Sequence, residues 1–435
     1  MEFSRYCKIY KSDTGIDDVI LFSTKTAAKV VIPESMVKDI ECGRTTEEER
    51  DTLAELGFLV MSAEDEKAEI GQFIDDLNGV DTIFAAKVVM NLDCNFACKY
   101  CFEGQRKGKF FMTPEMADCF VDFVQAKAIS QTRTFDEIRL TFYGGEPLLS
   151  SDLIIYVSER IKALAKDNGL TYTGYIITNG SLLTLKNAER LRAVGLKEAS
   201  VTIDGPKEIH DQFRPFGSGT GSFDLIIRNL KNVCGLIDIE VAGNFTRDSF
   251  REFPRLLDYL MEEGLTPEKI SGVRFMPVTQ ERAGIAPADF HDGCSSFNEP
   301  WLLEAGIYLR EEILRRGYRT AKVTPTPCLI DIKNRLIVNY NGSIYKCPGL
   351  IGREEYKIGD IKSGIKDYRK SHNLDNWKND KCLDCEYLPL CFGGCRYMKF
   401  LRDGNMNGVD CKKPNFDATL EALIKQDIIY DLTKS

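Results

Sequence analysis

Short apolar runs alternate with longer amphipathic stretches between residues 84 and about 278 of the chain. The apolar runs read FAAKVVMNL, IRLTFYGG, YTGYIITNG, EASVTIDG, IDIEVAGNF and ISGVRFMPV. Helical patterns occupy residues 114–128, 151–167 and 184–194 between them. Strands that alternate with helices in this way predict an α/β unit with a parallel sheet wrapped by helices. In such a fold the chemistry is expected at the carboxyl ends of the strands.

Residues 1–84 have a different pattern and are predicted to form a small α+β module. RYCKIYK, DDVILFSTK and AKVVIP are strand-like, and residues 33–40 and 46–56 have helical patterns that end at Gly57. The rest of the chain divides into the strand–helix unit at residues 85–280, a helical linker at 281–320 and a cysteine-rich unit at 321–435.

The 435 residues include 15 cysteines, and the formal net charge is −9. No apolar run approaches the length of a membrane span, and MEFSRYCKIYK lacks the apolar core of a signal peptide, so we expect a cytoplasmic protein without a membrane partner. Many cysteines in a long chain of a reducing compartment indicate metal ligation.

The negative charge is concentrated in residues 41–81, which hold 13 acidic and 3 basic residues, a local balance of −10. The sequence has no stretch of basic residues that could bind a phosphate backbone, so we expect no nucleic-acid partner. The acidic stretch is either a solvated helical face or a docking surface for a basic peptide.

Three cysteines follow the first apolar run of the strand–helix unit, in the segment NLDCNFACKYCFEG. Cys94, Cys98 and Cys101 have C-x3-C-x2-C spacing, which can seat three irons of a cubane cluster and leave the fourth iron open to a small ligand. A zinc knuckle or three buried cysteines are the simpler alternatives.

This triplet, with Tyr100 before its last cysteine, resembles the signature of radical S-adenosylmethionine (SAM) enzymes. The resemblance implies a partial (β/α)6 TIM-like barrel and a [4Fe–4S] cluster whose open iron binds the amino and carboxylate groups of SAM. It also implies an aromatic ring near the adenine, and a 5′-deoxyadenosyl radical that abstracts hydrogen from the substrate. An electron donor such as flavodoxin or ferredoxin is expected as a partner.

The predicted strand ends carry further candidates for SAM binding. By resemblance, the segment Gly144-Gly145-Glu146-Pro147 holds the SAM amino group, because glycines admit a close backbone approach and Glu146 or nearby carbonyls accept from an amine. The remaining candidates are polar residues at or after the third and fourth strands, and each is also a common turn residue: Asn179, Ser181, Thr202, Asp204 and Arg214. No side chain is singled out as the catalytic acid, base or radical donor.

Seven cysteines near the C-terminus resemble the SPASM extension of radical SAM peptide maturases. The resemblance implies two auxiliary [4Fe–4S] clusters, three clusters in all, with the inner one held by Cys328, Cys347 and Cys395 and the outer one by Cys382, Cys385, Cys391 and Cys411. A structural role or zinc is the alternative. Seven thiolates fall one short of eight, so the inner cluster either has an open iron or takes Cys294 as its fourth ligand.

The cysteine that corresponds to Cys347 is followed by an aspartate base in anaerobic sulfatase-maturing enzymes, whereas this chain has Pro348, which argues against formylglycine formation. Four segments resemble geopeptide radical SAM maturases: NLDCNFACKYCFEG, FYGGEPLLS, RPFGSGTGSFDLIIRN and GNFTRDSFREFPRLLDYL. The resemblance implies a ribosomally made precursor peptide whose leader adds a strand to the N-terminal module. The alternative is that this module only packs against the core as a cap. The expected product is a thioether or another crosslink. Epimerisation, another SPASM oxidation and a non-catalytic iron–sulfur or zinc scaffold are the alternatives.

Overall fold

The computed structural model describes the chain except for residues 14, 16, 102, 130–134, 281–291 and 433–435, so the first part of the predicted linker lies outside the described residues. Its centre is a parallel sheet in which each strand pairs with the next one along the chain. These strands are β6 (Ile83–Asn91), β7 (Glu137–Gly144), β8 (Thr171–Thr178), β9 (Leu196–Thr202), β10 (Asp238–Phe245) and β11 (Ile270–Pro277). The predicted parallel α/β architecture is confirmed.

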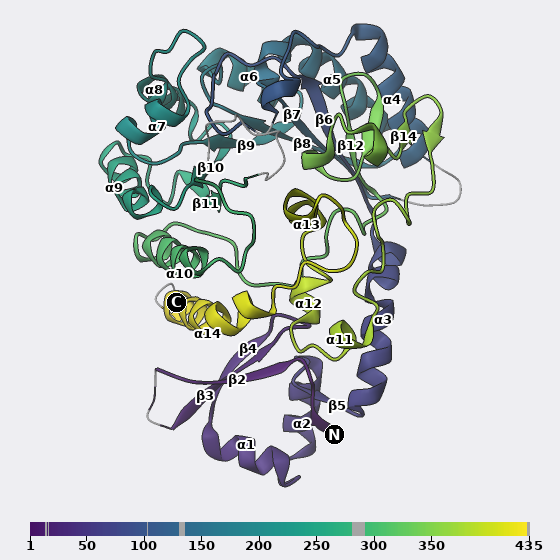
Figure 1. The fold of residues 1–435 in the computed structure, drawn as a ribbon, viewed down its shortest axis with the longest axis vertical. Coiled ribbons are helices and arrows are strands. Elements are labelled where there is room, and N and C mark those ends of the chain that lie inside the picture. The colour runs from purple at the N-terminus through teal and green to yellow at the C-terminus, as the bar shows by residue number, and fades with distance from the viewer. Residues whose placement is uncertain (14, 16, 102, 130–134, 281–291, 433–435) are drawn as a thin grey trace.

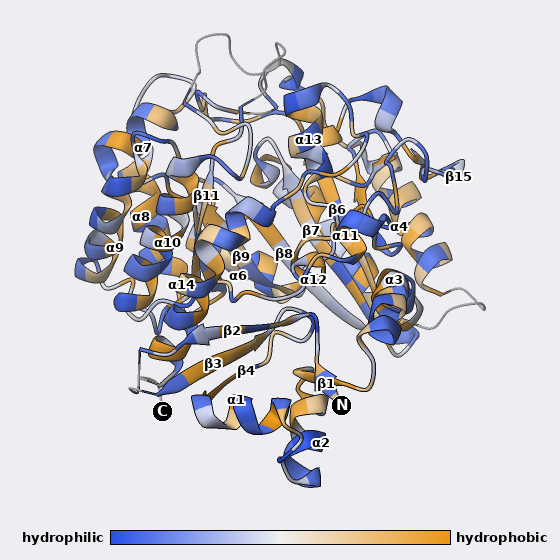
Figure 2. Cartoon of the chain, turned by 60° about the horizontal axis from the view of Figure 1, so that its bottom comes forward, coloured by the Kyte–Doolittle hydropathy of each residue, from blue (hydrophilic) through white to orange (hydrophobic). Residues whose placement is uncertain are grey.

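Helices cover this sheet between the strands (Figure 1). They are α4 (Pro114–Ala128), α5 (Ser151–Asp167), α6 (Leu185–Ala193), α7 (Lys207–Phe213), α8 (Phe223–Val233) and α9 (Phe253–Glu262). Thr113 caps α4 and Thr184 caps α6, each through a hydroxyl that accepts from a backbone amide in the first turn. Apolar side chains of strands and helices share one large core, and Figure 2 shows hydrophobic residues along strands such as β6.

The sheet continues beyond the predicted barrel into the C-terminal part of the chain. Strand β12 (Arg335–Val338) pairs in parallel with β6, and β13 (Ser343–Tyr345), β14 (Gly359–Asp360) and β15 (Gly364–Ile365) extend it with antiparallel pairs. The four-residue run RLIV was not predicted as a strand. Because it covers the β6 edge, the cysteine-rich unit and the barrel share one sheet.

The N-terminal module forms a three-stranded antiparallel sheet from β2 (Cys7–Lys11), β3 (Asp18–Ser23) and β4 (Lys29–Pro33). Two predicted helices follow as α1 (Glu34–Glu41) and α2 (Glu47–Glu55). The sequence did not predict β1 (Glu2–Phe3), its partner β5 (Leu59–Val60) or the long helix α3 (Ala63–Val80). Val19 and Leu21 on one face of β3 pack on the module's own helices, whereas Ile20 and Phe22 on the other face pack on the C-terminal part of the chain.

The C-terminal half adds α10 (Pro300–Arg315), α11 (Asp380–Leu383), α12 (Leu388–Cys391), α13 (Arg396–Asp403) and α14 (Lys413–Leu432). Arg310 of α10 joins this helix to α14 by an ion pair with Asp427, and Figure 1 shows α14 between α10 and the N-terminal sheet. None of the helices in the described part of the chain is both long and apolar enough to cross a membrane.

Candidate active site

A cavity of about 230 Å³ opens at the carboxyl ends of the barrel strands. Most of the predicted SAM-site and first-cluster residues line it: Cys94, Cys98, Cys101, Tyr100, Gly144, Gly145, Asn179, Thr202 and Arg214. These residues come from the loops after β6, β7 and β8, from the end of β9 and from the segment after α7. The structure therefore brings together segments that are more than a hundred residues apart in sequence.

The three thiols of the first cysteine set share this cavity, and their local backbone is well defined. The amide of Phe96 donates to Cys94 Sγ at 3.4 Å, and the amide of Cys101 donates to the Cys98 carbonyl at 3.3 Å. Burial raises the pKa of Cys94 to about 11, and the nearby Lys107 ammonium opposes this rise. In the described residues, no three His, Cys, Asp or Glu side chains are close enough to hold a single metal ion. Three soft sulfur donors around one cavity fit a cluster, in which each thiolate binds a different iron.

A buried polar network supports Tyr100 at the cavity wall. The Tyr100 hydroxyl donates to the Asp204 carboxylate and accepts from Arg214 Nη1 at 2.7 Å. Asp204 Oδ1 also accepts from the Asn244 amide at 2.7 Å, and Arg214 lies 3.7 Å from the Asp204 carboxylate. Asp204 is 1% exposed and does not line the cavity. It therefore supports Tyr100 and Arg214 from behind the cavity wall, and its place on the SAM or substrate side stays a prediction.

Asp204 and Arg214 are also linked through their backbones by a buried histidine. The Asp204 amide donates to His210 Nδ1 at 3.1 Å, and His210 Nε2 lies 3.0 Å from Ser222 Oγ. Ser222 Oγ in turn donates to the Arg214 carbonyl at 2.7 Å. Burial holds the pKa of His210 well below its usual value, so the neutral ring can accept at Nδ1. These hydrogen bonds connect the two ends of the segment that runs from Asp204 to Arg214.

Glu146 was predicted to accept from a ligand amine, but its side chain is turned into the protein. Its Oε1 accepts from the Leu148 amide at 3.0 Å and from Thr178 Oγ1 at 2.7 Å, and its Oε2 accepts from the Asn179 amide at 2.8 Å. The side chain is fully buried, which raises its pKa, while these three donors favour the ionised form. The carboxylate thus joins the ends of β7 and β8, and neither it nor Pro147 lines the cavity.

The two glycines of the same segment are required by a close approach between backbones. A Cβ on Gly144 would lie 2.3 Å from the Asn91 carbonyl oxygen, and one on Gly145 would lie 2.1 Å from the Asp93 carbonyl oxygen. The Gly145 amide donates to the Asn91 carbonyl at 3.0 Å. Glycine at these positions lets the end of β7 support the start of the cysteine loop.

Asn179 and Ser181 connect the end of β8 to the cysteine loop. Asn179 Nδ2 donates to Asn95 Oδ1 at 2.8 Å and lies 3.9 Å from Cys94 Sγ. Ser181 Oγ donates to Asn179 Oδ1 at 2.6 Å and accepts from Asn95 Nδ2 at 2.9 Å, and it does not line the cavity. Ser181 therefore positions Asn179, and its contact with SAM stays a prediction.

Six cavity residues were not predicted from the sequence: Glu103, Lys107, Tyr143, Ile177, Thr178 and Asn244. Glu103 is 5% exposed, its Oε1 has no hydrogen-bond partner, and burial raises its pKa to about 7. Lys107 donates to the Phe96 carbonyl at 3.1 Å. The available signal was the position of Glu103 and Lys107 in the sequence, two and six residues after Cys101.

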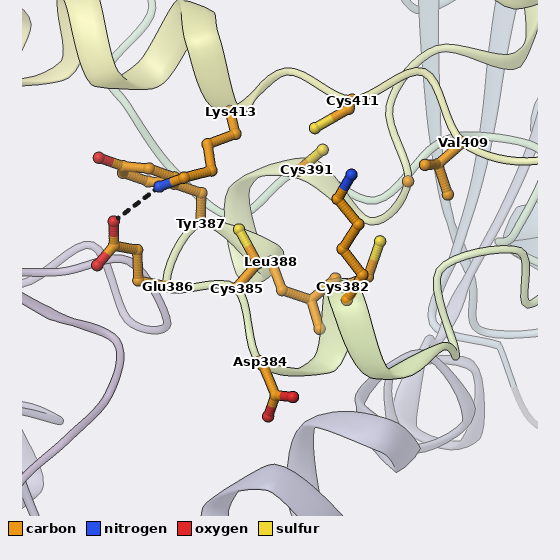
Figure 3. Close-up of a pocket in the computed structure, with 12 residues that line it drawn as sticks. Cys382, Asp384, Cys385, Glu386, Tyr387, Leu388, Cys391, Val409, Cys411 and Lys413 are labelled. Atoms are coloured by element: carbon orange, nitrogen blue, oxygen red, sulfur yellow. Dashed lines mark hydrogen bonds and ion pairs between the residues drawn. The ribbon is translucent and has the colours of Figure 1, made fainter.

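A second cavity, of about 390 Å³, lies in the C-terminal part of the chain. All four cysteines assigned to the outer cluster line it, and Figure 3 shows them around it: Cys382, Cys385, Cys391 and Cys411. Lys413 lies at its rim, where it forms an ion pair with Glu386 at 3.2 Å. Four thiols around one cavity give a complete donor set for a four-iron cluster.

The cysteines assigned to the inner cluster also lie near one another. Burial raises the pKa of Cys347 to about 12, and the charges of Cys328 and Cys395 add to this effect. Cys294 is fully buried, and it packs in the same apolar cluster as Cys395. The Cys294 amide donates to the Val278 carbonyl at 2.8 Å, which holds this cysteine at the end of β11.

Comparison with known proteins agrees with this geometry. The family model described as the Radical SAM superfamily matches residues 88–260. The AdoMet-dependent heme synthase of Nitratidesulfovibrio vulgaris is 25% identical, over 72% of this chain and 86% of its own length. The serine-type anaerobic sulfatase-maturating enzyme of Bacteroides thetaiotaomicron is 24% identical, over 71% of this chain and 81% of its own length.

Two solved structures have similar folds. The structure described as native anSMEcpe with bound AdoMet and Cp18Cys peptide has a TM-score of 0.62 at 17% identity, covering 81% of this chain and 99% of the other. Streptococcus suis SuiB bound to the precursor peptide SuiA has a TM-score of 0.56 at 14% identity, covering 94% of this chain and 98% of the other. A radical SAM domain implies SAM and a [4Fe–4S] cluster as cofactors. Residues 88–260 therefore form a radical SAM domain of an enzyme, and the chain is similar to radical SAM maturases such as these.

Proposed function

We propose that the enzyme modifies a ribosomally made precursor peptide by hydrogen abstraction. Cys94, Cys98 and Cys101 would hold the reactive cluster, and SAM would lie against Tyr100 and the glycine backbone of the first cavity. When bound, this cluster supplies the electron that cleaves SAM to methionine and a 5′-deoxyadenosyl radical, which takes a hydrogen atom from the peptide. The observation that carries this proposal is the convergence of the three thiols with Tyr100 and Arg214 on one cavity.

The described residues would bind and position SAM. Arg214 is a buried cation whose charge is only partly matched by Asp204, and its Nε has no partner, so it can receive an anionic group such as the SAM carboxylate. Glu103 Oε1, which also lacks a partner, can accept from an amine or a ribose hydroxyl. The buried Glu146 carboxylate keeps the backbone beneath SAM in place.

A peptide substrate is supported by similar folds that contain bound peptides, the SuiA precursor in SuiB and the Cp18Cys peptide in anSMEcpe. The N-terminal module, residues 1–84, has the order of strands followed by helices that is expected for a leader-binding element, and β2 and β4 are edge strands of its sheet. A flavodoxin or ferredoxin would supply the electron. A small-molecule substrate is the competing interpretation, because one relative is a heme synthase.

The fourth ligand of the inner cluster would determine whether that cluster can bind the peptide. Cys294 packs beside Cys395 and is the candidate fourth ligand to a cluster at Cys328, Cys347 and Cys395. If Cys294 is a ligand, an added thiol should change the spectrum of that cluster in Cys294→Ala but not in the wild-type protein. If the thiol already changes the wild-type spectrum, the fourth iron is open to a substrate thiolate, which favours thioether formation over epimerisation.

Anaerobic reconstitution tests the proposal. With SAM and a reductant, the wild-type enzyme is expected to release 5′-deoxyadenosine and to hold about twelve irons, four for each of three clusters. Replacing Cys94, Cys98 and Cys101 together by alanine should abolish the release and spare the auxiliary irons. Cys42→Ala, at an exposed cysteine outside the three sets, is the control and should change neither. Release that persists in the triple variant refutes the assignment.

Co-expression with a short cysteine-containing reading frame beside the gene identifies the product by mass spectrometry. A crosslink removes two mass units, and epimerisation leaves the mass unchanged. Deleting residues 1–80 should abolish peptide binding. Retained binding would favour a substrate that does not use the N-terminal module.

A further inference from the structure

The N-terminal module contacts the loop that carries two candidate ligands of the outer cluster. This loop, residues 382–387, begins with Cys382 and includes Cys385, and we call it the outer loop. Arg5 Nη1 lies 3.4 Å from the Leu383 carbonyl and 3.2 Å from Asp384 Oδ1. Lys67 of α3 reaches the same aspartate at 2.6 Å. Asp384 is 56% exposed, so these ion pairs orient the loop but contribute little stability.

A buried hydroxyl makes a tighter connection between the same two parts of the chain. Thr24 Oγ1 donates to the Glu386 carbonyl at 2.7 Å and lies 3.2 Å from the Tyr6 carbonyl. The Thr24 amide also donates to the Tyr6 carbonyl at 2.8 Å. Thr24 is fully buried, so its hydroxyl makes this hydrogen bond inside the protein and not at the surface. The position of the outer loop therefore depends on the β2–β3 hairpin.

Two buried donors next to this loop have no hydrogen-bond partner among the residues that the structure describes. The Tyr6 hydroxyl and the Trp377 indole nitrogen are both unpaired, and both side chains are fully buried. They share one apolar cluster with Leu388, and Cys382 packs against that cluster. Burial raises the pKa of the Tyr6 phenol. The charges of Arg5, Glu66 and then Cys385 also act on this pKa. A buried donor left unpaired is costly, so an acceptor is expected when the site is complete.

We propose that the N-terminal module supports the outer loop from outside the cavity, so that docking of the module and metal loading at Cys382, Cys385, Cys391 and Cys411 stabilise each other. The Tyr6 hydroxyl, which does not line the cavity, then donates to a cysteine thiolate of the loaded site. This inference rests on the proposed function for the outer cysteine set. By linkage, docking of the module changes the metal affinity by the same factor as metal binding changes the docking equilibrium.

Hydrogen exchange on the full chain measures one direction of this linkage. Amides of β2 and β3 should exchange more slowly in the reconstituted wild-type protein than in Cys411→Ser, in which one exposed outer ligand is removed away from the module. Amides of α5 in the barrel are the internal control and should not change. Equal exchange of β2 and β3 in both proteins overturns the proposal, as does an equal change in α5, because the effect would then be global.

Iron release to a chelator measures the reverse direction. Thr24→Val keeps the shape of the side chain and removes the donor to Glu386, so iron should leave the outer site about 2- to 12-fold faster. The matched control is Thr52→Val, in which an exposed hydroxyl that bonds only within α2 is removed. Release from Thr24→Val at the wild-type rate contradicts the proposal.

Tyr6→Phe separates a metal-directed donor from an ordinary packing residue. Without metal the hydroxyl has no partner, so its removal should leave exchange of the hairpin unchanged or slower. With metal, the same variant should release outer-site iron about 2- to 12-fold faster. Equal release from Tyr6→Phe and wild type refutes the role of Tyr6. Failure of the proposed function is distinct, because it would appear as missing outer-site iron or missing 5′-deoxyadenosine in the wild-type protein.

Discussion

The Glu146 carboxylate offers a sharp test of how the barrel supports its active site. Its two oxygens accept three hydrogen bonds, from the Leu148 amide, Thr178 Oγ1 and the Asn179 amide. Glu146→Gln keeps the size of the side chain but replaces one acceptor oxygen with an NH2 donor. The new NH2 group must then face a backbone donor, either the Asn179 amide or the Leu148 amide. The variant therefore loses at least one charge-assisted hydrogen bond in a fully buried position.

A hydrogen bond to a charged group contributes about 1.5–3 kcal/mol, so local opening should become about 10- to 150-fold more frequent. Amide exchange at Asn179 and Leu148 reports this directly, and one of the two should lose protection by that factor. The control is Glu189→Gln at an exposed position on α6, which should change neither amide. If both amides remain as protected in Glu146→Gln as in wild type, the carboxylate does not join β7 to β8 and the reasoning is wrong.

Three further predictions concern backbone packing, a buried ion pair and a buried imidazole. Gly145→Ala places a Cβ 2.1 Å from the Asp93 carbonyl oxygen, so it should displace the cysteine loop and lower the iron bound per chain after reconstitution. Arg396→Met leaves the buried Asp331 carboxylate without its two guanidinium bonds at 2.8 and 2.9 Å, and should cost about 3–5 kcal/mol in the free energy of unfolding. Burial lowers the pKa of His372 to about 4, below its unfolded value, so its contribution to stability is complete above about pH 6.5 and is lost as the pH falls toward 4. Denaturation of His372→Gln should therefore depend less on pH than that of wild type in this window.

Matched controls accompany these variants. Gly71→Ala meets no atom within 4 Å of its new Cβ and should bind iron normally. Arg44→Ala removes an exposed ion pair with Asp39 and should leave the free energy of unfolding within about 0.5 kcal/mol of wild type. Wild-type stability in Arg396→Met, or normal iron binding in Gly145→Ala, would contradict the corresponding prediction.

The barrel strands were predictable because short runs with alternating buried apolar positions recur between helical patterns. Helix α3 was not predicted, since its buried positions include Glu66 and Asn78 as well as Ile70 and Ile74. Such a mixed stripe has no clear apolar period, and the acidic positions around it indicate only a solvated surface. Strand β12 was missed because three apolar residues after an arginine, between two cysteine segments, do not define a strand.

Sequence patterns placed most of the candidate site but could not tell which way its side chains point. Glu146 finds its partners at Thr178 and Asn179, more than thirty residues away, so its inward direction depends on how β7 meets β8. Asp204 likewise meets Tyr100 only after the fold brings them together. A motif thus fixes the residue types near a site, whereas the division between ligand contact and support depends on tertiary partners.

The parallel pairing of β12 with β6 has a consequence for anyone who wishes to study the barrel alone. A fragment that ends before residue 321 would lack β12 and leave the amides and carbonyls along that side of β6 without partners. An unpaired strand of this length is a template for association with other chains. Such a fragment would be expected to self-associate, so expression trials should retain the C-terminal half even when only the chemistry of the barrel is of interest.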